Sequence, residues 1–213
     1  MDPKAFDIVY GIVGLKAAGK GAFGDRMNAA GFATYTLSTP IKVIAEKEVG
    51  PDYDVVIDLI RIGNEGRQKH GTGHWAGEML MLASQAGHRK VVIDGIRNPG
   101  EIIRLRELLG ERLVLVGVTA PSELRFQRLL KRGKKGDPTD LPSFLEMDDK
   151  DRGIGQADDG QLVDRCLAQV PFANIYDNHG TLQQFHEWID VLHARESVRV
   201  ERAIIEESTD YID

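Results

Sequence analysis

A glycine-rich segment near the start of the chain has the composition and spacing of a phosphate-binding loop. Residues 14–20 read Gly-Leu-Lys-Ala-Ala-Gly-Lys and fit the pattern G-x-x-x-x-G-K. In such loops the glycines let successive backbone N–H groups face one anion, and the lysine reaches the terminal phosphates of a nucleotide. We therefore expect nucleotide phosphates to be bound by Gly14, Lys16, Ala17, Ala18, Gly19, Lys20, Gly21 and Ala22.

The neighbours of this segment strengthen the prediction, because the bare pattern occurs by chance in roughly one such glycine-rich chain in ten. The apolar run of residues 6–13 leads directly into the loop and indicates a strand buried on both faces. A helix is predicted from about residue 20 to residue 30, and the N-terminus of a helix adds partial positive charge. A strand, a loop and a helix in this order are typical of a phosphate site.

The residue after the loop lysine departs from the usual pattern. Gly21 stands where a Ser or Thr commonly holds magnesium, and Ala22 has no hydroxyl either. A magnesium ion here would then be held through waters, phosphates and a carboxylate. Asp94 is the natural candidate, since it ends the β-branched run 91–93 and strand ends meet at one edge of a parallel sheet. Capping of the helix that follows is the alternative role for Asp94.

Arginines are concentrated where the chain could close over an anion. Arg97 follows Asp94 closely, and a guanidinium grips phosphate with two N–H groups. Arg125, Arg128 and Arg132 recur at three- and four-residue spacing and share one helix face, just before a polar segment at about 132–160. Such cations stabilise a transferring phosphoryl group while closure excludes water. We expect Arg97, Arg128 and Arg132 to act in catalysis beside a mobile lid, with a solvated basic face as the alternative.

A second group of binding residues lies in the segment of about 38–88. Arg61, Asn64, Arg67 and Trp75 supply cations, an amide and an aromatic plane, which suit the phosphate and the base of an acceptor nucleotide. Trp75 could equally belong to the hydrophobic core. The neighbouring histidines at 70 and 74 do not indicate zinc, because the sequence suggests no third ligand.

The pattern of apolar runs predicts the fold class. Strands are expected at residues 6–13, 32–37, 91–94, 112–118 and 172–176. Helical segments alternate with them, and Thr181 is placed to cap a long terminal helix. This alternation predicts an α/β protein in which a five-stranded parallel sheet lies between two layers of helices, a three-layer α/β/α arrangement. We expect one domain over residues 1–200 and an acidic C-terminal tail at 201–213.

Composition limits the classes of function. The chain of 213 residues carries a formal net charge of -6, which opposes binding to polymeric nucleic acid. Its single cysteine cannot form an internal disulfide, and Cys166 is expected to be a small buried apolar residue in a reducing compartment. No apolar run is long enough to cross a bilayer, so we expect a cytoplasmic protein without a membrane partner. The oligomeric state stays open, a homodimer included.

Taken together, these motifs resemble the P-loop nucleotide kinases, and within them the (deoxy)nucleoside monophosphate kinase-like branch. The resemblance is carried by the loop at 14–20, the helix opening at 38–42, Gly63-Asn64 with Arg67 and Trp75, and the segments 94–101 and 125–133. The last two segments are also similar to the kinase-like portion joined to some deoxycytidylate deaminases. The zinc signature of those deaminases is absent from the sequence.

The resemblance implies transfer of the γ-phosphoryl group of ATP, with Mg²⁺, to a (deoxy)nucleoside monophosphate, a modified pyrimidine nucleotide included. It implies that Lys20 bridges phosphates, Asp94 serves magnesium, Arg67 holds the acceptor and Asn178 lies near the adenine. It also suggests Arg152 as an arginine that returns from the lid. Two alternatives stay open: a kinase of another small acceptor such as dephospho-coenzyme A, and a regulatory module that binds nucleotide without turnover.

Overall fold

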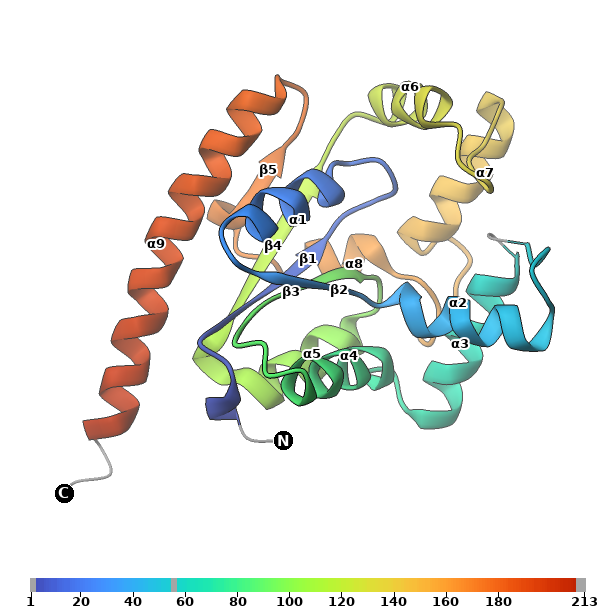
Figure 1. The fold of residues 1–213 in the computed structure, drawn as a ribbon. Coiled ribbons are helices and arrows are strands. Elements are labelled where there is room, and N and C mark those ends of the chain that lie inside the picture. Colours follow the sequence, from blue (N-terminus) through green and yellow to red (C-terminus); the bar gives the residue numbers. More distant parts are fainter. Residues whose placement is uncertain (1–2, 55–56, 210–213) are drawn as a thin grey trace.

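The computed structural model describes residues 3–54 and 57–209. Five strands alternate with helices along the chain (Figure 1). The strands are β1 (Ile8–Val13), β2 (Ala33–Thr36), β3 (Lys90–Ile96), β4 (Leu113–Thr119) and β5 (Ile175–Asp177). The helices are α1 (Lys20–Ala29), α2 (Ser38–Glu48), α3 (Ile57–His70), α4 (His74–Gln85), α5 (Pro99–Leu109), α6 (Ser122–Arg132), α7 (Leu141–Arg152), α8 (Val163–Leu167) and α9 (Leu182–Thr209).

The strands form one parallel sheet in the order β2-β3-β1-β4-β5, which confirms the predicted five-stranded parallel sheet. β1 is the central strand, and all of its residues are buried. Because the strands are parallel, their carboxyl ends lie at the same edge. The loop after β1 and the turn after β3 therefore meet there, as the sequence predicts.

Successive side chains of β1 enter two different hydrophobic cores, because a strand turns alternate residues to opposite faces. Val9 and Val13 pack in a core that α2, α3, α4, α5 and α8 complete. Tyr10 and Ile12 pack against residues of α1 and α9. Figure 1 shows α1 and α9 on one side of the sheet and α4 and α5 on the other. The predicted three-layer arrangement is confirmed, and the buried Cys166 is part of the first core.

The start of β5 and the end of α9 differ from the prediction made from the sequence. Phe172 lies in a short 3-10 turn and is 92% exposed, so β5 begins only at Ile175. Residues 201–209 continue helix α9, and the expected boundary at residue 200 has no counterpart in the backbone. Residues 210–213 lie outside the described part. At the other end of α9 the predicted cap is confirmed: the Gln184 N–H donates to Thr181 Oγ1 (3.2 Å).

The polar segment 132–160, which we call the lid, contains helix α7. This helix packs on α6 through a small separate core of Leu129, Phe144 and Met147. Figure 1 shows α6 and α7 at the edge of the molecule where β1 runs into the glycine-rich loop. Within the ranges described, no helix is both long and apolar enough to cross a bilayer.

Candidate active site

The glycine-rich loop connects β1 to α1 with backbone conformations that favour glycine. Gly19 has a φ of 127° and Ala17 a φ of 61°, both in the left-handed region. Gly14 lies so close to the backbone oxygen of Val118 that a Cβ atom would clash with it. Gly19 precedes α1 and makes no side-chain cap, so the first N–H groups of α1 are left for another acceptor. Such a loop and helix start are suited to an anion.

The ammonium of Lys20 lies inside the loop. It donates hydrogen bonds to the backbone oxygens of Gly14 (2.7 Å) and Leu15 (3.1 Å). Burial lowers the pKa of Lys20, and the nearby carboxylate of Asp94 opposes this effect. The lysine thus lies at the centre of the loop, next to the end of β3.

Asp94 has a buried carboxylate oxygen that lacks a partner. Oδ1 makes no hydrogen bond within the described structure. The cap of α5 is Asn98, whose side chain accepts from the Gly100 N–H (2.9 Å), so the alternative role of Asp94 as a helix cap is wrong. A buried oxygen without a partner is costly unless a ligand satisfies it, and Mg²⁺ or a magnesium-bound water would do so.

The donor set fits a magnesium ion held by one carboxylate. Among the residues described, no three or more His, Cys, Asp or Glu side chains group into a metal site. Mg²⁺ in phosphate-transfer sites usually keeps several waters and takes only one or two carboxylates in addition to the substrate phosphates. Gly21 leaves open space where a hydroxyl ligand would stand, since nothing lies within 4 Å of the position of its Cβ.

Beside the loop lies a cavity of about 170 Å³, which we call the acceptor cavity. It is lined from α2, α3, the turn after β3, α7 and the segment before α8. Its charged and hydroxyl side chains are Lys16, Ser38, Lys42, Arg67, Arg97, Glu101 and Asp151. Arg97 donates to the Gln161 side-chain oxygen (3.2 Å) and lies 3.8 Å from Asp151 Oδ1, to which the Gln161 amide nitrogen donates. The cavity therefore lies between the phosphate loop, helices α2 and α3, and the lid.

Three of the predicted acceptor residues line this cavity, namely Arg67, Trp75 and Arg97, and a fourth, Asn64, contacts Arg67. Arg67 is buried and donates to Asn64 Oδ1 (2.6 Å) and to the backbone oxygen of Asp159 (2.6 Å), and it pairs with Glu101 (3.4 Å). Arg67 lines the cavity and Asn64 orients it. Arg61 lies elsewhere: its exposed guanidinium pairs with Asp58 and Glu65 on α3.

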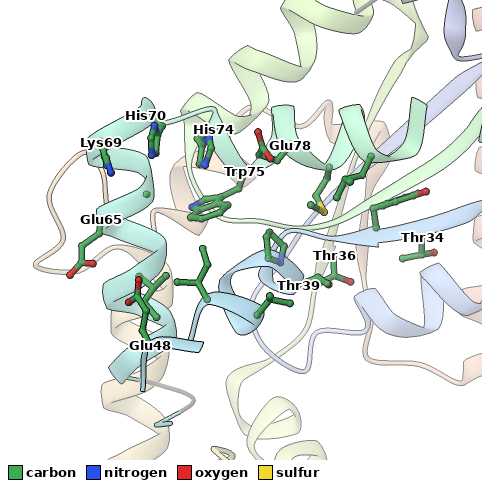
Figure 2. A pocket seen from close by; sticks show the side chains of 18 residues that line it. Thr34, Thr36, Thr39, Glu48, Glu65, Lys69, His70, His74, Trp75 and Glu78 are labelled. Atoms are coloured by element: carbon green, nitrogen blue, oxygen red, sulfur yellow. The ribbon is translucent and has the colours of Figure 1, made fainter. Parts of the chain in front are cut away.

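Trp75 separates the acceptor cavity from a larger pocket. The indole is 3% exposed and donates to the Gly63 backbone oxygen (3.0 Å), so the core alternative describes it well. The second pocket, about 800 Å³, opens along β2 and is drawn in Figure 2 with Trp75 next to His74. Among the described residues that line it, none belongs to the phosphate loop.

The three arginines of α6 have separate partners and do not form one basic face. Arg125 is buried and makes two hydrogen bonds to Asp148 (2.5 and 2.8 Å), which ties α6 to α7. Arg132 pairs in the same way with Asp137, and it holds the pKa of that carboxyl low although burial alone would raise it. The prediction that all three arginines present one basic face is therefore wrong for Arg125, which is buried.

Arg128 reaches the phosphate loop. It donates to the backbone oxygens of Ala17 (3.3 Å), Ala18 (3.2 Å) and Asn178 (2.9 Å). The Asn178 amide in turn donates to Ala18 (2.8 Å). Both residues therefore hold the loop from the side of β5. Arg152, in contrast, pairs with Asp164 (2.9 Å) at the surface and does not return to the site.

Lys16 of the phosphate loop and Asp151 of the lid have contacts that the sequence does not predict. Lys16 was expected only as part of the loop, but its ammonium donates to Met147 Sδ (3.1 Å) on α7. Asp151 was not singled out at all, because its partner Arg97 lies far away in the sequence. The acidic run at 148–151 was its only signal.

Comparisons with known proteins agree with the fold. No protein-family model matches the chain. A UPF0200 protein of Pyrobaculum aerophilum is 31% identical over 151 residues, which cover 70% of this chain and 80% of the relative. A UPF0200 protein of Halobacterium salinarum is 28% identical over 195 residues, 91% of this chain and 96% of the relative. Among solved structures, a gluconokinase of Sinorhizobium meliloti 1021 matches with a TM-score of 0.50 and 15% identity over 95% of this chain and 98% of that one.

Proposed function

The chain belongs to the UPF0200 family and has a P-loop kinase-like fold, and from this premise we propose that it transfers the γ-phosphoryl group of ATP to a (deoxy)nucleoside monophosphate. One observation carries the proposal. The buried, unpartnered Oδ1 of Asp94 and the ammonium of Lys20 lie together beside a loop whose backbone is open to an anion. A polyphosphate with its magnesium ion would supply partners for the Asp94 oxygen, the Lys20 ammonium and the backbone N–H groups of the loop.

Each residue of the site would have a role set by its charge: the cations and N–H groups would bind phosphates, and Asp94 would bind magnesium. The backbone of residues 14–22 would grip the phosphates of ATP, and Lys20 would lie between the phosphates that separate. Magnesium, when bound beside Asp94, would neutralise charge on the phosphates. Arg97 would hold the acceptor anion. Arg128 and Asn178 would keep the loop in shape, and Arg132 would act only after it leaves Asp137.

A phosphate acceptor needs no base. An oxygen of the acceptor phosphate attacks the γ-phosphorus, the bond to the bridging β-γ oxygen breaks, and ADP leaves with that oxygen. Positioning and electrostatics therefore supply the rate, without a covalent intermediate on the protein. The acceptor cavity of about 170 Å³ is smaller than the roughly 300 Å³ that small ligand pockets usually provide, so the lid must move to admit a nucleotide.

ADP formation against a panel of ribo- and deoxynucleoside monophosphates, with gluconate and dephospho-coenzyme A added, tests the proposal. We expect one class of nucleoside monophosphate to exceed the other acceptors by roughly tenfold or more in kcat/KM, because acceptor contacts discriminate by about 1–3 kcal/mol. ATP binding without turnover of any acceptor would contradict the proposal and favour a nucleotide-binding regulatory module.

Gly21→Ser is expected to lower the magnesium concentration needed for half-maximal turnover by several-fold. Gly21 lies in the first turn of α1 with open space around it, so a serine fits and supplies the hydroxyl ligand that the chain lacks. Magnesium titrations of turnover check this. Gly21→Ala is the matched control, since it adds the Cβ without the oxygen. Equal magnesium dependence of both variants would contradict the prediction.

A further inference from the structure

Asp151 is a carboxylate of the lid that is buried inside the acceptor cavity. It lies near the end of α7 and is 4% exposed. Its Oδ1 is 3.8 Å from Arg97 Nη1, which is too long for a hydrogen bond and long for an ion pair. A buried carboxylate is costly unless cations compensate it. The Gln161 amide donates one hydrogen bond to Oδ1, and the positive charges around the carboxylate supply the rest of the compensation.

Those charges are the cations expected to meet phosphate. Asp151 lies close enough to Lys16 and Lys20 to raise the pKa of each, against the lowering by burial. The hydrogen bond described for the Lys16 ammonium goes to a thioether sulfur, which is a weak acceptor. Lys16, Lys20 and Arg97 thus form a cationic group, and the carboxylates that act on its two lysines are Asp94, Asp151 and, for Lys16, Asp137.

The ion pairs between the lid and the rest of the protein are of different kinds, and those of Arg152 with Asp164 and of Asp158 with Arg165 lie at the surface. Arg125 and Asp148 make two hydrogen bonds of 2.5 and 2.8 Å and are both almost fully buried. That pair holds α6 and α7 in a fixed position relative to each other. Arg97 and Asp151 make one long contact, and Arg97 is 32% exposed at the cavity. A stronger anion could therefore replace Asp151 without breaking a hydrogen bond between them.

We propose that Asp151 occupies the position of the acceptor's phosphate in the unliganded protein, and that the acceptor displaces it and moves α7. Asp151 is then a positioning residue that sets the affinity for an anionic acceptor, and it takes no part in the transfer. Because Asp151 leaves Arg97 only when a competing anion arrives, acceptor binding is coupled to movement of the lid. The inference rests on the proposed function for the identity of the acceptor.

The test compares Asp151→Asn with Asp149→Asn. Both substitutions remove one charge from α7, but the side chain of Asp149 is exposed and outside the cavity. For Asp151→Asn we expect the KM of the acceptor to fall by roughly tenfold, which corresponds to about 1.4 kcal/mol, with a much smaller change in kcat. Asp149→Asn should keep the wild-type KM. Asp151→Glu should restore most of the wild-type KM, since it restores the charge.

A calorimetric titration with inorganic phosphate, in the absence of ATP, separates this inference from the proposed function. Phosphate should bind Asp151→Asn more tightly than wild type by a similar factor, whether or not any acceptor is turned over. Unchanged phosphate affinity and unchanged KM would overturn the inference. A large fall in kcat at constant KM would also overturn it, because the carboxylate would then act on the reacting atoms.

Discussion

Lys20→Ala is expected to lower ATP-dependent phosphoryl transfer by at least about 100-fold, the loss typical for removal of one preorganised donor from a transition-state site. The ammonium lies inside the loop and makes its hydrogen bonds to Gly14 and Leu15, so it is in place before the substrate arrives. Alanine removes both the charge and the contact with the transferring group. Initial rates of ADP formation with the best acceptor measure the effect.

Stability must be measured beside activity for this variant. Removal of the ammonium leaves the backbone oxygens of Gly14 and Leu15 without that donor, and the loop could lose its shape. Thermal unfolding of the variant detects such a loss. Lys131→Ala is the matched control, because that lysine is exposed on α6. A Lys20→Ala protein that turns over at the wild-type rate would refute the assignment of the loop as the phosphate site.

Asp94→Asn is expected to reduce turnover by roughly 100-fold, a loss of the size found for groups that stabilise transition-state charge. It should also raise the magnesium concentration required. The amide keeps the shape of the side chain but is a poor magnesium ligand. Magnesium titrations of turnover, with thermal unfolding in parallel, measure both consequences.

The same substitution should leave the unfolding temperature within a few degrees of wild type. Oδ1 makes no hydrogen bond that could be lost, and the lower cost of burying a neutral amide than a charged carboxylate opposes the loss of attraction to Lys20. Asp177→Asn serves as control, since Asp177 ends β5 in the same sheet but is exposed. Full activity of Asp94→Asn at low magnesium would remove the carboxylate from the proposed site.

The sheet and the loop were predictable because their signals are local. The run before Gly14 is apolar without alternation, and the loop pattern follows at once, so strand, loop and helix support one another within a short segment. Phe172 shows the limit of such reasoning. An apolar aromatic before Ile175 favours a strand, but the chain turns there and leaves the ring 92% exposed.

The partners of the arginines were not predictable from spacing. Helical periodicity correctly puts Arg125 and Arg128 near each other on α6, but it says nothing about which element faces them. Asp148 on α7 and the backbone of Ala18 decide their roles, and both are distant in sequence. For the same reason, the sequence does not decide whether Trp75 packs in the core or contacts a ligand. Its indole donates to Gly63 within the hydrophobic core, and the same ring lines the acceptor cavity.

The position of Trp75 has a practical consequence. The chain contains two tryptophans, and they lie on opposite sides of the sheet: Trp75 in the wall of the acceptor cavity, and Trp188 on α9 against Tyr176 and Phe185. Indole emission depends on its immediate surroundings, so each ring reports on its own side. With Trp188 changed to phenylalanine, the remaining fluorescence becomes an intrinsic optical signal for occupancy of the cavity, recorded without a label.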